Sequence, residues 1–117
     1  MTGVQTCALP IYGRDLLPLL TGVTDRSPHA FFHYLAGSAE GRVNYRGIRD
    51  ERWKLIVSEG DDGLKGTELY DLAADVSERF DRAGRHPDVV ARLESAARGF
   101  LTEIRANLRP AGRAADR

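Results

Sequence analysis

Cysteine, methionine and tryptophan each occur once in this chain of 117 residues. A single cysteine cannot form a disulfide within the chain, so the cysteine content does not indicate a redox compartment. No apolar run approaches the roughly 20 residues of a membrane-spanning helix, and Met1–Pro10 has neither the basic start nor the apolar stretch of a signal peptide. The 17 basic and 17 acidic residues give a formal net charge of zero. Charge therefore gives no reason to expect a nucleic acid or an anionic membrane as the partner.

The length allows one small domain with a modest core. Its first residues, Met1–Ile11, have no convincing periodicity and resemble the translation of a common sequencing adapter. We therefore expect residues 1–12 to be a non-native leader, in which Cys7 is neither a nucleophile nor a metal ligand and the native residue at position 12 is undetermined. The predicted subdomain covers residues 13–109, and residues 110–117 are expected to form a disordered tail.

The stretch Val43–Val57 has the pattern of two short strands folded back on each other about Asp50 and Glu51. A period of two is typical of strands with one buried face. A hairpin alone is marginal in water, so this one needs a second layer. Along the stretch, Val43, Tyr45 and Gly47 alternate with Asn44, Arg46 and Ile48, and Trp53, Leu55 and Val57 alternate with Lys54 and Ile56.

Shorter elements are predicted on both sides of this hairpin. A short helix is expected within Gly13–Gly22, with Asp15 as its N-cap and Gly22 as its stop. His29–Leu35 is aromatic-rich and predicted as a strand, and Glu68–Leu72 as another. Between them, Glu59–Gly66 is expected to be a flexible connection.

The last predicted element is an amphipathic helix that begins at Pro87. Apolar residues recur every three or four positions and form one stripe, made of Val90, Leu93, Ala97, Phe100 or Leu101, Ile104 and Leu108. The chain is therefore predicted to be α+β, a small antiparallel sheet of three to four strands packed on one C-terminal amphipathic helix. Trp53 and Tyr70 are expected in the core between the two layers.

Five motifs, in order and at the expected approximate spacing, resemble the C-terminal part of arylsulfatase-like sulfatases, members of the alkaline phosphatase superfamily. They cover nearly all of residues 13–108. The sequence departs from the family pattern at three positions, where Val76 replaces proline, Asp81 replaces asparagine and Arg82 replaces leucine. The motifs are Asp15–Gly22 (DLLPLLTG), Phe31–Tyr34 (FFHY), Ile48–Asp50 followed by Trp53–Leu55 (IRD and WKL), Glu68–Leu72 (ELYDL), and Asp75 with Glu78.

The resemblance implies a parent enzyme that hydrolyses sulfate esters with a formylglycine nucleophile and a calcium ion. The formylglycine is made from the first residue of a C/S-x-P-x-R motif, which the sequence around Cys7 does not match. In the family these groups lie N-terminal to the region found here, so this chain is expected to have no catalytic residue, no metal ligand and no activity alone. Asp61 and Asp62 are interpreted as a solvated turn rather than a metal site.

His33, Tyr34 and Arg46 are the candidate residues for the rim of the substrate pocket. The resemblance places the strand of His33 and Tyr34 at this rim, whereas the alternation of a strand predicts that one of the two faces the core. Arg46, like Arg49, Arg52 and Lys54, is interpreted mainly as a strand-edge charge that prevents edge pairing, with contact to an anionic substrate as the alternative for Arg46 or Arg49.

The predicted function is thus that of an inactive C-terminal fragment of a sulfatase, with the missing N-terminal catalytic domain as its partner and a small sulfated molecule as the parent's substrate. The alternatives are the tail of a phosphonate or phosphate monoester hydrolase, or a free-standing sheet–helix binding module. By resemblance, the parent is expected to be periplasmic or secreted. An apolar patch near Leu16–Leu20, with one of Phe31 and Phe32, is predicted to be exposed where the catalytic domain would cover it.

Overall fold

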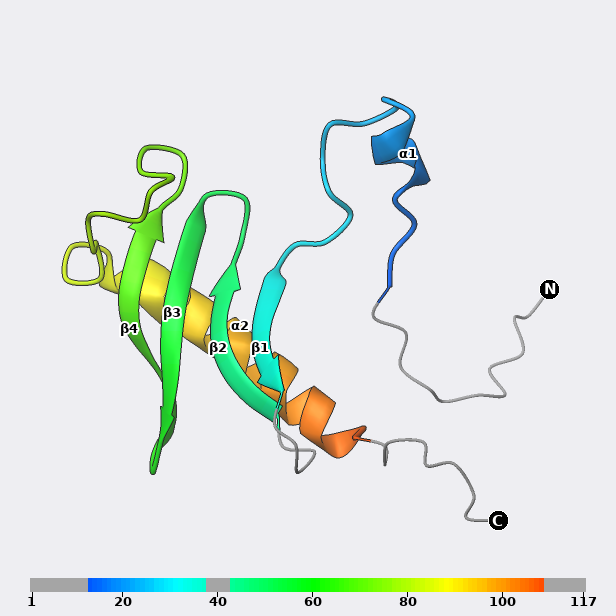
Figure 1. Cartoon of the computed structure of the whole chain (residues 1–117). Coiled ribbons are helices and arrows are strands. Elements are labelled where there is room, and N and C mark those ends of the chain that lie inside the picture. The colour runs from blue at the N-terminus through cyan, green and yellow to red at the C-terminus, as the bar shows by residue number, and fades with distance from the viewer. Residues whose placement is uncertain (1–12, 38–42, 109–117) are drawn as a thin grey trace, which may run out of the picture.

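The structure is a computed structural model that describes residues 13–37 and 43–108. The predicted leader (1–12) and tail (110–117) lie outside the described residues and stay predictions. Figure 1 shows the elements in chain order. They are α1 (Leu17–Leu20), β1 (Phe32–Gly37), β2 (Val43–Arg49), β3 (Trp53–Gly60), β4 (Gly63–Asp71) and α2 (Pro87–Ala106).

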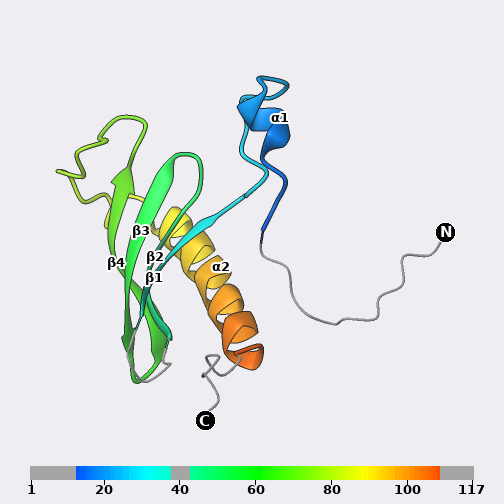
Figure 2. The ribbon, with the colours of Figure 1, turned by 45° about the vertical axis from the view of Figure 1, so that its right-hand side comes forward.

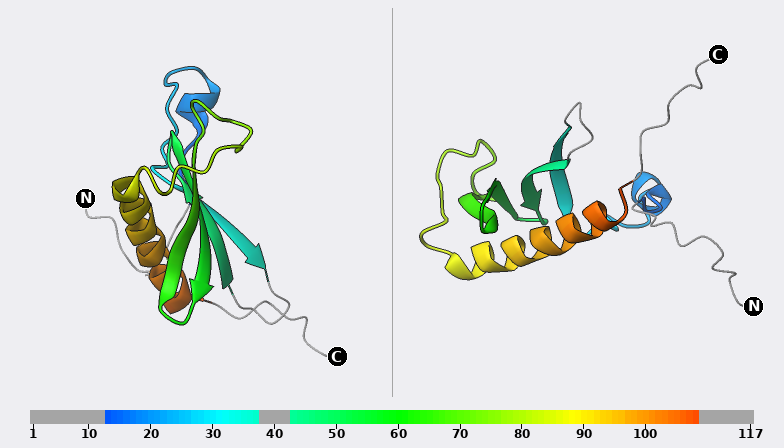
Figure 3. Two further views of the ribbon diagram at one scale, coloured as in Figure 1. Left: turned by 90° about the vertical axis from the view of Figure 1, so that its left-hand side faces the viewer. Right: turned by 90° about the horizontal axis from the view of Figure 1, so that it is seen from below.

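The four strands form one antiparallel sheet in the order β1-β2-β3-β4. Helix α2 lies along one face of this sheet, as both views in Figure 3 show. It begins at Pro87 with Asp88 in the first turn and has Arg105 in the last turn, so the charges at both ends favour the helix dipole. The predicted α+β fold, with its C-terminal helix, is confirmed.

The hairpin of β2 and β3 turns at Asp50, as predicted. Oδ1 of Asp50 accepts the backbone N–H of Arg52 at 2.8 Å and that of Trp53 at 2.6 Å. The backbone N–H of Asp50 donates to the carbonyl of Trp53 at 3.0 Å. A carboxylate that binds amides ahead of it stabilises a tight turn without the glycine that many hairpins use.

A bulge interrupts the strict alternation predicted for β2. Tyr34 pairs with Gly47 and Leu35 pairs with Tyr45, so Arg46 has no partner in β1. The extra residue reverses the side of the sheet to which the next side chains of β2 point, and Tyr45 and Ile48 are therefore both in the core. The prediction that Tyr45 and Ile48 lie on opposite faces of the strand was wrong for this reason.

Two predicted boundaries also need correction. Glu59–Gly66 is not a flexible connection, because β3 continues to Gly60 and β4 begins at Gly63, leaving a tight turn of Asp61 and Asp62 between them. Gly63 has a φ of +96°, a conformation that glycine adopts at no steric cost. β1 begins later than the predicted His29 and extends to Gly37.

The core lies between the sheet and α2. Trp53 is only 8% exposed, which confirms its prediction. Tyr70 was wrongly predicted in the core: it pairs in register with Lys54 on the other face, and its hydroxyl donates to the carboxylate of Glu68. The core residues are Tyr45, Ile48, Trp53, Leu55, Val57, Leu64, Leu69, Leu93, Ala97 and Leu101.

Helix α1 stands beside the sheet and α2 rather than in their interface (Figure 2). A hydrogen bond from the N–H of Leu17 to Asp15 at 2.9 Å helps to begin it, and Gly22 with φ +79° follows its end. Leu20 is 79% exposed, and Leu16, Leu17 and Leu19 are exposed as well. Phe32 is exposed whereas Phe31 packs against the core. The predicted exposure of these leucines and of one of the two phenylalanines is confirmed.

The charges of β2 and β3 do not lie at a sheet edge, because both strands are interior strands. The edge interpretation of Arg46, Arg49 and Lys54 was therefore wrong. Nζ of Lys54 instead pairs with Glu78 at 2.6 Å, and Arg52 in the turn pairs with Asp71 at 2.7 Å. Within the described ranges, neither helix is long and apolar enough to span a membrane.

Candidate functional site

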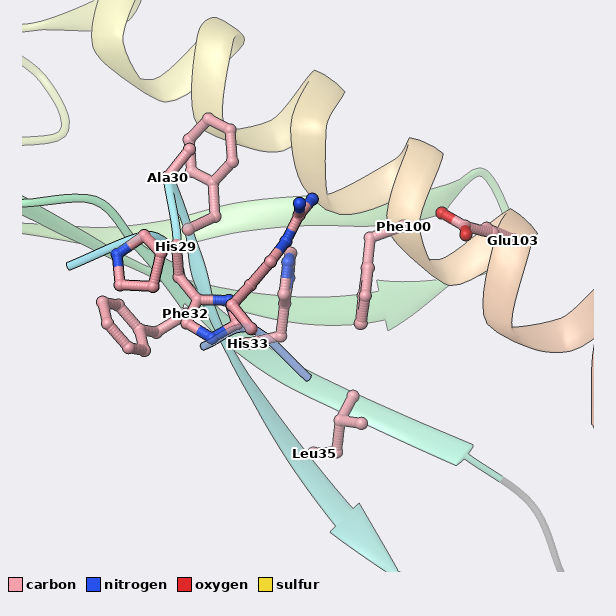
Figure 4. A pocket seen from close by; sticks show the side chains of 10 residues that line it. His29, Ala30, Phe32, His33, Leu35, Phe100 and Glu103 are labelled. Atoms are coloured by element: carbon pink, nitrogen blue, oxygen red, sulfur yellow. The ribbon is translucent and has the colours of Figure 1, made fainter. Parts of the chain in front are cut away.

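A pocket of about 550 Å³ opens between β1, the segment that precedes it, and the C-terminal half of α2. Figure 4 shows the side chains that surround it. Most of its wall is aromatic or apolar, and titratable groups enter from four segments: the one before α1, the one before β1, β1 itself and α2. The lining residues are Arg14, Pro28, His29, Ala30, Phe31, Phe32, His33, Leu35, Phe100 and Glu103.

His33 lines this pocket and contacts both Phe100 and Tyr45. Its ring stacks on Phe100 of α2, with the centroids 3.5 Å apart and the planes 5° from parallel (Figure 4). Nδ1 of His33 and the hydroxyl of Tyr45 are hydrogen-bonded at 2.5 Å. Burial lowers the pKa of His33 to about 4 and raises that of Tyr45. At neutral pH His33 is therefore an uncharged imidazole held by a phenol.

The charges around the pocket are balanced. Arg14, from the segment before α1, contributes one cation, and Glu103 of α2 contributes one anion. His29 lies against Phe32, with ring centroids 5.9 Å apart. Such a site has aromatic walls for the apolar part of a small molecule, together with a few groups that form hydrogen bonds. Among the residues that line it, none carries a hydroxyl or thiol nucleophile, and the phenol of Tyr45 is the hydroxyl that His33 contacts.

The three predicted rim residues do not come together. His33 faces α2, whereas Tyr34 lies on the opposite face of the sheet, where the ammonium of Lys54 is 4.9 Å from its ring centroid. The prediction that one of these neighbours faces the core and the other faces outward is confirmed. Arg46, at the bulge, lines a separate pocket of about 320 Å³ with Asn44, Tyr45, Ser58 and Glu59. The role of all three at a substrate rim stays a prediction.

Two carboxylates of the sequence motifs are held by arginines and backbone amides. Asp71 accepts the Nε and a terminal nitrogen of Arg52, at 3.1 and 2.7 Å, and the N–H of Ala73 at 3.2 Å. The bonds from Arg52 hold the pKa of Asp71 below its usual range. Burial raises the pKa of Asp50, but bonds from Trp53 and Arg92 outweigh this effect and lower it. Both groups are ionised and already occupied at neutral pH.

Two further carboxylates of the motif region close the loop after β4. Asp75 accepts the amides of Arg79 and Phe80, both at 2.9 Å. Asp81 accepts the amides of Leu69 and Ala83, both at 2.9 Å, which lowers its pKa. The two bonds to Asp81 use one carboxylate oxygen, Oδ1, and the carbonyl oxygen of an asparagine could accept them in the same way. The departure at position 81 therefore preserves the turn.

A calcium ion does not fit the described residues. Among residues 13–37 and 43–108 no three histidine, cysteine or acidic side chains are grouped so as to hold a metal. Two of the motif carboxylates, Asp50 and Asp71, are ion-paired with Arg92 and Arg52. Calcium needs about six to eight oxygen ligands, which these paired groups do not supply. We therefore derive no step through a metal on this chain.

The sequence did not predict which side chains contact His33 or share its pocket. Phe100 was correctly placed on an apolar helical stripe, but its stacking on His33 depends on how closely α2 approaches β1. Tyr45 was placed on a predicted strand, yet nothing in its neighbours indicated a hydrogen bond to a residue twelve positions away. Arg14 and Glu103 carried no motif, so only the fold could place them at one pocket.

No family model matches the chain, and no curated protein matches it.

Proposed function

We propose that this chain is the C-terminal subdomain of an arylsulfatase-like sulfatase, whose sulfate ester hydrolysis depends on a catalytic domain outside it. The observation that carries the proposal is the order of the five motifs, which fall on α1, β1, the β2–β3 turn, β4 and the loop after β4. The polar motif residues hold turns and loops together. Such structural contacts are expected in a supporting subdomain. In a catalytic centre, these polar residues would be accessible to the substrate.

The parent's chemistry is assigned to the missing domain. Formylglycine would supply the nucleophile and calcium would offset the charge of the sulfate, and the described residues contain no group of side chains that could hold the calcium. The substrate would be a small sulfated molecule, and the parent would be periplasmic or secreted. Within this chain, His33 would contribute a neutral imidazole at its own pocket, and Arg46 would contribute a positive charge only at a separate pocket.

The exposed apolar patch supports a covered surface on the parent protein. Four leucines at and beside α1 are exposed, together with Phe32. Exposed apolar groups that gather in one region mark an interface more often than isolated ones do. We assign this surface to contact with the catalytic domain of the same polypeptide.

The source gene provides the direct test. Sequencing upstream of the codon for Gly13 should reveal a catalytic domain with a C/S-x-P-x-R motif, in frame with this chain. An upstream domain with a different nucleophile would favour a phosphonate or phosphate monoester hydrolase. Native coding sequence that runs without a break through codons 1–11 would remove the interpretation of those residues as adapter.

Activity provides a second test. The purified chain should release no sulfate from an aryl sulfate with calcium present, because the family's catalytic groups are expected on the missing domain. Turnover above background that persists in Cys7→Ala would contradict the assignment of catalysis to that domain.

A free-standing sheet–helix binding module is the second candidate, and the closed core favours it. Among the described residues, no buried side-chain nitrogen or oxygen lacks a hydrogen-bond partner. A module that folds without another domain needs a core of this kind, because unsatisfied buried polar groups would destabilise it. Binding of a hydrophobic dye distinguishes the two: a fragment with a lost interface should bind it at α1, with the signal reduced in Leu20→Lys, whereas a free-standing module should not bind it.

A further inference from the structure

The two edges of the sheet are closed to different degrees. β4 forms one edge, and parts of the same chain bond to its backbone. Leu69 donates its N–H to Asp81 at 2.9 Å, and its carbonyl accepts the N–H of Arg82 at 2.7 Å. The guanidinium of Arg98 binds the carbonyl of Leu64 at 2.7 Å. Backbone groups already paired in this way cannot recruit another strand.

β1 forms the other edge, and the described residues do not close it in this way. Within residues 13–37 and 43–108, its backbone is hydrogen-bonded only in the ladder with β2. Its sequence, FHYLAG, contains no charged residue and no proline, the two devices that most often prevent edge pairing. Six residues of strand extend roughly 20 Å, long enough for several inter-strand hydrogen bonds.

The side chains of β1 add apolar surface on both faces of this edge. Phe32 is 43% exposed and Tyr34 39%, and Leu35 is 46% exposed. Leu35 faces the same side as His33, at the pocket, whereas Tyr34 faces the open side. A strand added beside β1 would therefore cover apolar groups on both faces while it binds the free backbone groups.

We propose that the β1 edge pairs with β1 of a second copy of this chain, antiparallel about a two-fold axis, to form one continuous sheet across two molecules. A strand without charges suits a second copy of itself, because no like charges come to face each other. An isologous contact satisfies the same groups on both chains at once and cannot grow into a fibre. The proposal does not rest on the sulfatase assignment; it concerns the chain as it stands, in which Phe32 is exposed.

Sedimentation equilibrium of the full chain tests the association. We expect a reversible dimer, and Leu35→Lys should raise its dissociation constant at least about tenfold, since two lysines would be brought close together across the axis. Leu35→Thr, which keeps strand propensity without adding charge, should retain the dimer. Leu20→Lys is the matched control: it exchanges an exposed leucine on α1 for the same charge and should leave the dimer unchanged.

Cross-linking tests the geometry without depending on a charged variant. In a Cys7→Ala background, Tyr34→Cys should form disulfide-linked dimers under mild oxidation, because antiparallel pairing about the middle of β1 brings these positions within disulfide reach. Val76→Cys, at a position 82% exposed on the loop after β4, should not cross-link at the same rate. Hydrogen exchange at two concentrations should show protection of the β1 amides that increases with concentration.

Three results would overturn the proposal. A monomer at every concentration would do so, as would a dimer that dissociates in Leu20→Lys and persists in Leu35→Lys, because the leucines of α1 would then hold it together. The third result is that the β1 amides of the dilute monomer are protected from hydrogen exchange and lose this protection when residues 1–12 are deleted. In that case the leader of the same chain would occupy the edge.

Discussion

The two faces of this sheet are formed by the same strands, yet they are stabilised in different ways. On the face toward α2, Trp53, Leu55 and Val57 are buried among apolar neighbours. On the open face, the residues between them take part in polar contacts, such as the pair of Lys54 with Glu78. Burial of a large apolar side chain contributes about 1.5–3 kcal/mol, whereas an ion pair reached by water contributes about 0–1 kcal/mol. Alternate residues of one strand should therefore differ severalfold in their effect on stability.

Trp53→Ala should produce the largest loss and show this difference most clearly. Removing a buried indole and leaving a cavity should destabilise the fold by about 3–5 kcal/mol, measured by urea denaturation. Its control is Tyr34→Ala, which removes an aromatic ring from the open face and should cost about 1 kcal/mol or less. A loss below about 1 kcal/mol for Trp53→Ala would mean that the two faces have been exchanged.

Gly66→Ala tests how tightly the covered face is packed. A Cβ at Gly66 would lie 2.9 Å from Cδ1 of Leu55 and 3.0 Å from Cγ1 of Val90. Because Leu55 is fully buried, it cannot move aside, and the substitution should destabilise by about 1–3 kcal/mol. The matched control is Gly99→Ala in α2, where nothing lies within 4 Å of the added atom. That change should stabilise by roughly 0.5–1 kcal/mol, so equal effects in thermal denaturation would argue against close packing at Gly66.

Acid should weaken the covered face first, through His33. Burial lowers its pKa to about 4, from an ordinary value of 6.5, so the folded state binds this proton less tightly than the unfolded chain does. Stability should therefore fall as the pH decreases from about 6.5 to about 4. The slope should stay well below the roughly 1.4 kcal/mol per pH unit of one fully displaced proton, because water screens this half-buried ring.

The comparison that isolates this slope is His33→Gln, an uncharged residue that can still hydrogen-bond with Tyr45. Urea midpoints at pH 7 and pH 4.5 should differ less in the variant than in the parent chain. The carboxylates of Asp50, Asp71 and Asp81 have lowered pKa values, so their contributions are lost only below their unfolded value of 3.8. An identical dependence of stability on pH in the variant would mean that groups other than His33 cause the acid sensitivity.

The smallest effect is expected on the open face. Lys54→Met removes the ion pair with Glu78 and the contact with the ring of Tyr34, but keeps an apolar side chain of similar length. Thermal denaturation should show a change below about 1 kcal/mol. A larger loss would show that this face is held by more than surface electrostatics, which would contradict the difference between the faces.

Much of the fold could be predicted because its signals are local. The helix from Pro87 and the strands of Val43–Val57 follow from periodicity and from the residues that flank them. Strand pairing around the tight turn at Asp61 was missed because glycine and aspartate favour loops and tight turns equally. The candidate site could be predicted only in part: alternation separated His33 from Tyr34, but no local signal indicated the approach of Phe100.

The sequence by itself determined the hairpin of Val43–Val57, the helix that begins at Pro87, and that Trp53 faces a core, because these depend on periods of two and 3.6 residues and on end signals within a few residues. Tertiary structure alone decided the bulge at Arg46, the burial of Ile48 and the contacts of His33 with Tyr45 and Phe100. These features depend on the register between strands and on the position of α2 above them. Such register and position result from packing between residues far apart in the chain, which no local pattern records.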